Sequence, residues 1–250
     1  MARTPRQQQI LAALEKSGKI AIADLAETFE VSDETIRRDL KILSAEGSVE
    51  KYHGGVRLSI PRAEPPFDHR LYDATDEKSA IATLAVSHVR EGATVLLDNS
   101  STACFFARAL AYREPMTILT ISLEVARILG SAGSRHRVIV PGGELRNSDR
   151  TIIGPGAIEF LSQFAPSYFV TSMVAGTSRG CFDFDLFEAE FKRAMIPLAD
   201  QTMVLMDNSK FGKSGLIHVC DWSEVDILVT NSPIAELDGH LSDCEILIAE

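Results

Sequence analysis

Apolar side chains recur at helical spacing in three short segments near the start of the chain. Residues 6–18 and 22–29 each carry one apolar face. In the third segment the apolar residues follow at i, i+4 and i+7, within about 60° of one another around a helix: Ile36, Leu40 and Leu43. Ser32 precedes this segment and is a suitable N-cap. The pattern predicts three consecutive helices.

The spacing changes after Gly47. Residues 48–58, "SVEKYHGGVRL", form two short extended runs around a Gly-Gly turn signal. Three helices followed by a hairpin are typical of a winged helix-turn-helix, in which the third helix enters the major groove of DNA and the hairpin lies against the backbone. The first part of the chain is therefore expected to bind double-stranded DNA.

Basic residues lie where such a domain would face DNA. A solvated helix face is the usual explanation of lone basic residues, but here the cap, the hairpin and the basic outer face agree with one another. The expected DNA contacts are Thr35, Arg37, Arg38 and Lys41 in the third helix, and Lys51, His53 and Arg57 in the hairpin.

Charge is divided unevenly along the chain. The net charge of -10 would by itself argue against a polyanionic partner. Residues 1–62, however, contain ten Lys and Arg against nine Asp and Glu, whereas residues 63–250 contain fifteen against twenty-six. The acidity therefore belongs to the second part of the chain, and DNA binding by the first part remains compatible with the composition.

The best domain boundary lies in "LSIPRAEPPFDHRLYDATDEK", residues 58–78, where Pro61, Pro65 and Pro66 interrupt regular structure. We expect a DNA-binding domain over 1–58, a proline-containing linker over 59–77 and a second domain over 78–250. The second domain alternates apolar runs with helical or polar stretches: "TVLLD", "MTILTI", "HRVIVPGG", "YFVTSM", "QTMVLMD" and "DILVTN". This order predicts an α/β domain with a mostly parallel sheet covered on both faces, and ligands of such sheets bind at the carboxyl ends of the strands.

One strand end carries a pattern suited to phosphate. "LLDNSST" places Asp98 and then three small hydroxyl residues before a helix that should begin near Ala103. Free amides and hydroxyls at a helix N-terminus bind anions, although a merely capped helix needs only one of these residues. The candidates are Asp98, Ser100, Ser101 and Thr102, with Thr120 at the end of the next strand.

Two further strand ends have weaker signals. Gly142 and Gly143 in "VPGGEL", followed by Glu144, let a ligand approach the backbone, or they form a plain turn. Lys210 in "LMDNSKFGKSG" supplies a point charge for phosphate, or it is a surface lysine.

The helix in "DLFEAEFKRAMIPLAD" adds Glu188 and Lys192 at i, i+4, with Asp183 before it. Most pairs of this spacing are surface ion pairs of small energy. Carboxylates near a phosphate site can instead accept hydrogen bonds from sugar hydroxyls.

Other classes of protein are disfavoured. The four cysteines lie far apart and are expected to be reduced core residues, and the histidines show no metal-ligand spacing. No signal-peptide pattern and no apolar run of roughly 18 residues occurs. We expect a cytoplasmic protein without a cofactor or a metal.

The DNA-binding motif also resembles a known family. "VSDETIRRDLKILSAEGSVEKYHGG" is similar to the signature of the DeoR family of bacterial repressors, and "DNSST", "PGGEL", "EAEFKRAM" and "DNSKFG" are similar to its effector domain. Within the family, the chain looks closest to the glycerol-3-phosphate repressor branch. The resemblance implies an effector domain with a fold like that of ribose-5-phosphate isomerase, and it implies effector-pocket roles for Asp98, Ser100, Ser101, Thr102, Gly143, Lys192 and Lys210. Ser100 departs from the family pattern, which commonly has glycine there.

The expected function is repression of a sugar or polyol catabolic operon, with release from the operator by a phosphorylated sugar-type effector. An enzyme that isomerises a sugar phosphate, with Glu188 or Asp183 as base, is the alternative. A third possibility is a DNA-binding architectural protein that needs no effector, but this function would not explain the large second domain. We expect the chain to form a dimer or tetramer with itself, because one small winged helix of net charge near +1 supplies little affinity and two half-sites multiply it.

Overall fold

The computed structural model describes residues 4–45, 49–52, 54–58, 64–131, 134–213, 215–234, 237 and 239–250. The chain divides into two compact units, Met1–Arg62 and Ala63–Glu250. Each unit has its own buried core.

The first unit is a winged helix-turn-helix, as predicted. Its helices are α1 (Pro5–Ser17), α2 (Ile22–Thr28) and α3 (Asp33–Ala45), and its sheet has the order β1 (Lys19–Ala21), β3 (Gly55–Leu58) and β2 (Val49–Tyr52). Both strand pairs are antiparallel. The predicted stripe of α3 is fully buried, and it packs with side chains of α1, α2 and the hairpin: Ile10, Leu14, Leu25, Val49 and Val56.

Local signals account for the ends of these helices. Thr4 Oγ1 accepts a hydrogen bond from the Gln7 amide, and Gln7 Oε1 accepts one from the Thr4 amide. Helix α1 therefore begins with a capping box. Ser32 Oγ accepts from the Thr35 amide at 3.3 Å and so caps α3, as predicted. Strand β1 was not predicted, because three residues are too few to show an alternating pattern.

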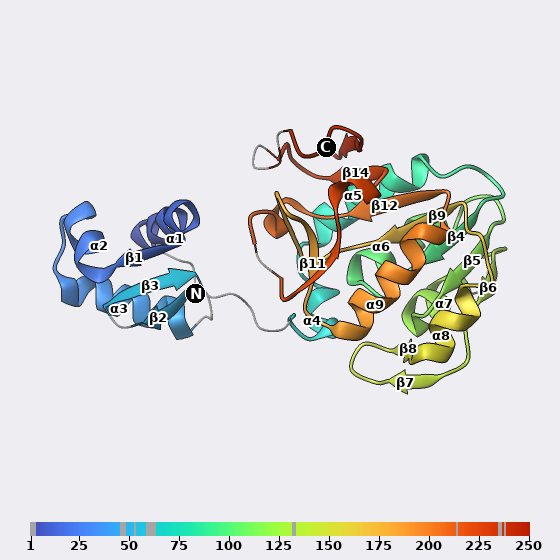
Figure 1. Cartoon of the computed structure of the whole chain (residues 1–250), viewed down its shortest axis with the longest axis horizontal. Helices are drawn as coiled ribbons and strands as arrows, with labels where there is room; N and C mark the ends of the chain where they lie inside the picture. Colours follow the sequence, from blue (N-terminus) through green and yellow to red (C-terminus); the bar gives the residue numbers. More distant parts are fainter. Residues whose placement is uncertain are drawn as a thin grey trace. The chain divides into compact units, whose positions relative to one another are not determined.

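The second unit contains a seven-stranded sheet in the order β15-β14-β12-β9-β4-β5-β6 (Figure 1). Every neighbouring pair in it is parallel. The strands are β4 (Thr94–Leu97), β5 (Thr117–Thr120), β6 (Arg137–Ile139), β9 (Tyr168–Thr171), β12 (Gln201–Leu205), β14 (Ile227–Thr230) and β15 (Glu245–Ile248). The predicted parallel α/β architecture is confirmed.

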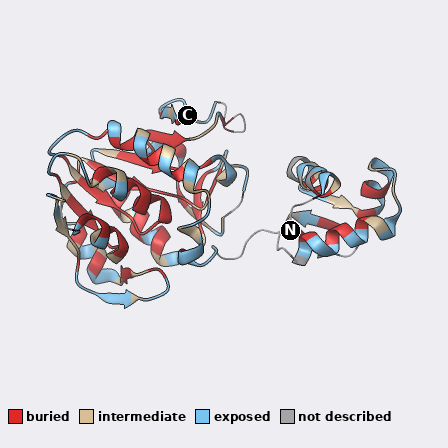
Figure 2. Ribbon diagram, turned by 180° about the vertical axis from the view of Figure 1, so that it is seen from behind, coloured by how far each residue is buried: buried red, intermediate tan, exposed pale blue. Residues whose placement is uncertain are grey.

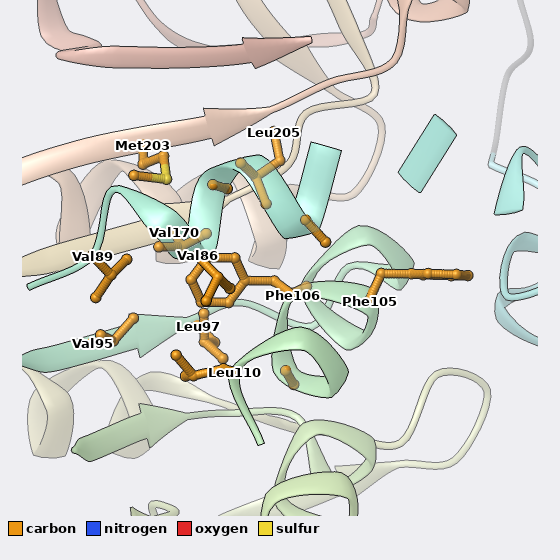
Figure 3. Packing of buried hydrophobic residues seen from close by; sticks show 14 of the residues in the cluster. Val86, Val89, Val95, Leu97, Phe105, Phe106, Leu110, Val170, Met203 and Leu205 are labelled. Atoms are coloured by element: carbon orange, nitrogen blue, oxygen red, sulfur yellow. The ribbon is translucent and has the colours of Figure 1, made fainter. Parts of the chain in front are cut away.

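Helices cover both faces of this sheet, because its central strands are apolar on both sides. One face packs against α5 (Thr75–Ser87), α6 (Ser101–Leu110) and α7 (Leu123–Leu129), and the other against α8 (Pro155–Leu161) and α9 (Leu186–Met195). Figure 3 shows the first layer, in which Val86 of α5 and Phe106 of α6 meet Leu97 and Val170 of the strands. Figure 2 shows the sheet buried almost throughout and the helices buried on their inner sides.

Smaller elements surround this frame. They are α4 (Phe67–Arg70), the hairpin β7 (Glu144–Arg146) and β8 (Thr151–Ile153), and a second antiparallel sheet of β10 (Ala175–Thr177), β11 (Gly180–Asp183) and β13 (Ile217–Cys220). Short 3-10 helices of this unit are η1 (Ile196–Leu198), η2 (Asn208–Lys210) and η3 (Trp222–Glu224).

The second unit begins earlier than residue 78, where we expected the second domain to start. Helix α4 and the first turn of α5 both lie within the stretch expected to be linker. Phe67 is buried in the core of the unit, so burial of this side chain outweighs the helix-breaking effect of the prolines before it.

The four cysteines are buried free thiols, as predicted. In the ranges given above, no helix combines the length and the apolar character needed to cross a bilayer.

Candidate functional site

The outer face of α3 is basic and open. Arg37, Arg38 and Lys41 are exposed, and Thr35 is half-buried near the start of the helix. Within the described part of the chain, the two arginines form no ion pair. Their charges therefore remain available to a polyanion.

A buried polar contact, which sequence reasoning missed, holds α3 against α1. Asp39 accepts from Arg6 Nε at 2.6 Å and from Gln7 Nε2 at 3.2 Å. Asp39 is buried although it lies beside Arg38 in the sequence. This contact fixes the angle at which α3 presents its basic face.

The hairpin presents less free charge than its sequence indicates. Lys51 is exposed, but Arg57 pairs with Glu50 across the hairpin at 2.7 Å. His53, the third basic residue predicted in the wing, lies outside the described residues. Lys51 is thus the wing residue with the stronger structural case for a phosphate contact.

In the second unit, Asp98 organises the loop between β4 and α6. One carboxylate oxygen accepts from the Ser100 amide at 2.9 Å, and the other accepts from Thr171 Oγ1 at 2.6 Å and the Ser172 amide at 3.0 Å. Asp98 is fully buried. It therefore ties the ends of β4 and β9 together, and its oxygens are engaged within the protein.

The N-terminus of α6 has unused hydrogen-bonding capacity. Ser100 is its N-cap and accepts from the Ala103 amide at 3.0 Å. Within the described ranges, the amides and hydroxyls of Ser101 and Thr102 have no hydrogen-bond partner. The backbone of Ser100 has φ -67°, which any residue adopts, so serine in place of the usual glycine causes no strain.

A buried cation stands among three carboxylates near this loop. Lys192 Nζ lies 2.6 Å from Asp183 Oδ2, 3.8 Å from Glu188 Oε2 and 4.0 Å from Asp98 Oδ2. Burial opposes the charge of Lys192, but the carboxylates outweigh it, and the pKa of Lys192 is raised above its usual value. The pair Glu188 and Lys192 is thus not the surface ion pair that its spacing indicates.

Glu188 connects this cluster to the β7–β8 hairpin. Its Oε1 accepts from Asn99 Nδ2 at 3.0 Å and from Arg146 Nη2 at 2.8 Å. Arg146 also pairs with Asp149 and Asp185. Burial raises the pKa of Glu188 to about 7, although Lys192 opposes the shift. Glu188 is therefore a carboxyl that changes charge near neutral pH.

Lys210 approaches the same region from the end of β12. Its Nζ donates to Ser172 Oγ and to Met173 O, both at 2.9 Å. Ser172, which directly follows β9, also donates its amide to Asp98, so one residue links the two strand ends. Burial lowers the pKa of Lys210, and an anion placed beside it would raise that pKa again.

The remaining predicted effector residues are engaged elsewhere. Thr120 is buried, and its Oγ1 accepts from the Ser122 amide at 3.0 Å. Gly142, Gly143 and Glu144 are exposed at the start of the β7–β8 hairpin. Gly143 has φ +154°, and a Cβ there would lie 2.8 Å from Ile152 Cγ2, so hairpin geometry accounts for this glycine. In the described part of the chain, none of these four residues bonds to the Lys192 cluster.

A hollow of about 740 Å³ lies at a different place, beside α4, α6 and α7. Its charged residues pair mostly with one another, as Arg127 does with Glu124 and Arg150 with Asp68. In both pairs the arginine is exposed, whereas the Glu124 carboxylate is buried and is already held by two arginines, Arg127 and Arg150. We therefore place the candidate site at the α6 N-terminus and the buried charges, where polar groups are both desolvated and incompletely paired.

Sequence reasoning missed several members of this site. Thr171 and Ser172 end the run "YFVTSM", so the rule that ligands bind at strand ends could have found them. Asn99 lies inside the quoted "DNSST" motif. Arg146 has no signal in the sequence, because its partners are 3, 39 and 42 positions away.

Comparison with protein families gives two matches. Residues 6–61 match the family model of the DeoR-like helix-turn-helix domain, and residues 73–232 match that of the DeoR C terminal sensor domain. Together the two models span most of the chain.

Characterised relatives align over nearly the whole length. The HTH-type transcriptional repressor CsqR of Escherichia coli K12 is 34% identical over 98% of this chain and 94% of that protein. The glycerol-3-phosphate regulon repressor of the same organism is 32% identical over 93% of this chain and 92% of that protein.

Solved structures align more distantly. Ribose 5-phosphate isomerase A of Methanocaldococcus jannaschii aligns with a TM-score of 0.41 and 17% identity over 55% of this chain and 54% of that one. The eIF2B beta subunit of Chaetomium thermophilum aligns with a TM-score of 0.49 and 16% identity over 68% of this chain and 53% of that one.

Proposed function

Because the chain belongs to the DeoR family of helix-turn-helix transcriptional repressors, we propose that it represses a sugar or polyol catabolic operon and that a phosphorylated sugar-type effector releases it from the operator. Family membership makes the protein a DNA-binding regulator with a sensor domain. Its relatives are named repressors, so it is a regulator and not the sugar-phosphate isomerase considered as the alternative.

For the DNA-binding unit, we propose that Arg37 and Arg38 reach the major groove and that at least one of them contacts a base edge. The support is the exposure of both side chains on α3 and the lack of an ion-pair partner for either among the described residues. Lys51, and Arg57 where Glu50 leaves it free, would contact phosphates and position the protein without reading sequence.

For the sensor unit, the observation that carries the proposal is the buried N-terminus of α6 with its unused hydrogen-bonding groups. Ser101 and Thr102 offer amides and hydroxyls without partners in the described chain. The desolvated Lys210 follows β12, two strands away from β4 in the sheet, and bonds to Ser172 after the intervening β9. A helix N-terminus with one lysine can bind a phosphate inside an acidic domain without many cations. Asn99 directly precedes the α6 N-cap and bonds to Glu188, and we propose that these two side chains bind the hydroxyls of the sugar or polyol.

We further propose that the working form is an oligomer. A dimer can place two winged helices on two half-sites, and the second contact then benefits from a high effective concentration. Sedimentation at micromolar concentration tests this. A monomer both with and without DNA would contradict it.

The effector proposal is tested by a thermal-shift screen of phosphorylated sugars and polyols, with their dephosphorylated forms as controls. A ligand bound by the native state alone raises the apparent melting temperature by mass action. The compounds that stabilise the protein should also release it from DNA that the protein has selected out of a random pool. Release by none of the phosphorylated compounds would overturn the effector part of the proposal and leave the DNA-binding part intact.

A further inference from the structure

The first described residue of the sensor unit forms a largely buried ion pair. Glu64 Oε2 lies 2.6 Å from Arg70 Nη1, and the two side chains are 20% and 14% exposed. By comparison, the pair of Arg135 and Glu114 on the surface of the same unit is 65% and 59% exposed. Burying two charges costs free energy that a surface pair does not, so the buried position of Glu64 and Arg70 calls for an explanation.

Helix packing and charge connect this pair to the candidate effector site. Lys78, buried on α5, donates to the backbone oxygens of Arg70 at 2.5 Å and Asp73 at 2.6 Å. The same ammonium lies over the ring of Phe105 in α6, 5.9 Å from its centroid. The chain around Arg70 is thereby held against the helix whose N-terminus is the proposed phosphate site.

Electrostatic effects show the same proximity. Burial lowers the pKa of Lys210, and the Glu64 carboxylate is the foremost charge opposing that shift. The Glu64 carboxylate also adds to the raised pKa of Glu188, after burial and the charge of Asp183. Glu64 is therefore close enough to act on both the cation and the carboxyl of the site.

Two buried polar atoms at this place lack partners among the described residues. They are Arg70 Nε and Asn99 Oδ1, and Asn99 is only 1% exposed. Buried polar atoms are nearly always hydrogen-bonded, so each such exception calls for an explanation, and a bound ligand is one that both atoms here would share. The guanidinium would donate to an anionic oxygen, and the amide oxygen would accept from a hydroxyl, which are the two kinds of group that a phosphorylated polyol carries.

We propose that Glu64 is an internal competitor of the effector: in the free protein its carboxylate takes the place beside Arg70 that the phosphate takes when the effector binds. This inference rests on the proposed function. Carboxylate and phosphate both match the fork of a guanidinium, and the phosphate dianion brings more charge. When the phosphate displaces Glu64, Arg70 changes partner and its unused Nε gains an acceptor.

Exchange of partners at Glu64 would link the site to the rest of the chain. Glu64 directly follows the segment that joins the sensor unit to the DNA-binding unit in the sequence. Its release frees the first residues of the sensor unit from the site. Loss of the ion pair between Glu64 and Arg70 would thereby alter how the first residues of the sensor unit are held. Ligand switches commonly act through such local changes in charge pairing.

The test uses the full-length Glu64→Gln protein, with inorganic phosphate as the probe in isothermal titration. Removing a carboxylate near the anion should tighten phosphate binding about tenfold. Glu114→Gln is the matched control, because it removes the same group from the exposed pair with Arg135, and its phosphate affinity should equal that of the wild type. Arg70→Lys keeps a charge but loses the fork, and it should weaken phosphate binding about tenfold.

The outcomes separate this inference from the proposed function. Phosphate binding by Glu64→Gln that is equal to or weaker than that of the wild type overturns the inference, as does the absence of binding by both proteins. The wild-type protein is tested separately for release from selected DNA by phosphorylated sugars and polyols. If release occurs and Glu64→Gln gains no affinity, the function stands and the competitor role fails. If Glu64→Gln gains affinity and no compound releases DNA, the anion site stands and the proposed function fails.

Discussion

Lys192 Nζ lies 2.6 Å from Asp183 Oδ2, and the two side chains are 2% and 1% exposed. This buried pair joins α9 to the end of β11. It brings Glu188, on the same helix, beside Asn99 and the N-terminal end of α6. The pair of Lys192 and Asp183, nine residues apart in the sequence, therefore helps to assemble the candidate effector site. The apolar pattern of the sequence alone does not predict that α9 and the end of β11 contribute to one site.

Loss of this cation should strongly destabilise the sensor unit. Lys192→Met leaves the buried Asp183 carboxylate without its cation, whereas Glu188 keeps Arg146. Breaking a buried pair in this way costs about 3–5 kcal/mol. Urea unfolding followed by circular dichroism measures the change in the free energy of unfolding. Arg135→Met, in an exposed pair, is the control and should cost less than about 1 kcal/mol. Equal stability of the two variants would show that the buried pair is not needed for folding.

Glu188 should make stability fall as the pH rises through the range from about 4.5 to 7. Its folded pKa is about 7, against an ordinary value of 4.5, so in this range the unfolded chain has lost a proton that the folded protein keeps. The contribution is at most roughly 3 kcal/mol. Glu188→Gln removes the titrating group, and the difference between the two stability profiles should flatten above pH 7. Parallel profiles from pH 5 to 8 would contradict the raised pKa.

Arg37→Ala together with Arg38→Ala should abolish operator binding and leave the sensor unit unaffected. Both side chains are exposed, so their removal should change stability by less than about 0.5 kcal/mol. A bidentate contact of arginine with guanine discriminates by about 1–3 kcal/mol. Gel-shift titration measures DNA affinity, and thermal shift with the effector checks the second unit. An unchanged gel-shift affinity would remove α3 as the recognition helix.

Lys51→Ala should weaken binding to operator and random DNA alike, and the slope of log affinity against log salt should fall by about one. Glu50→Gln should act in the opposite direction, because it frees Arg57 from its 2.7 Å pair. Both variants are compared with the wild type by fluorescence anisotropy at several salt concentrations. A loss confined to the operator sequence would show that the wing reads bases.

Lys210→Met and Ser101→Ala should hold the operator normally and need far more effector to release it. Both residues belong to the proposed phosphate site and neither lies in the DNA-binding unit. Coupling between effector and DNA is reciprocal and typically amounts to about 1–3 kcal/mol, so operator DNA should weaken effector binding by the same factor. An effector titration of the preformed DNA complex gives the midpoint of release. Wild-type midpoints in both variants would place the phosphate elsewhere.

The sequence by itself determined that the chain has two units and which types of main element each contains, but not where the second unit begins. In the first unit, the apolar stripe of α3, the cap at Ser32 and the Gly-Gly turn each act within a few residues. In the second, the strands of the parallel sheet are apolar on both faces and are therefore visible as short continuous runs. Both signals are local, because helix and strand periodicity repeat over distances shorter than the elements themselves.

The sequence also predicted some of the polar residues that lie at the strand ends. Asp98, Ser101 and Thr102 were predicted from a strand followed by small hydroxyls, and the structure places them at the N-terminal end of α6. Gly142 and Gly143 carried an equally plausible pattern, and they directly precede the β7–β8 hairpin, where Gly143 lies close to Ile152 of β8. Pattern alone does not separate the two cases, since close approach of backbone to a ligand and close approach to another strand both require glycine.

Tertiary structure alone decided which charges are buried together. Asn99 bonds to Glu188 across 89 positions of sequence, and Arg146 bonds to it across 42. Glu64 lies in the stretch predicted to be linker, yet it forms an ion pair with Arg70. A charged side chain looks the same in the sequence whether it ends in water or in the core. Its pKa, its partner and its role follow from desolvation and from the charges around it, and those are set only when distant segments pack against one another.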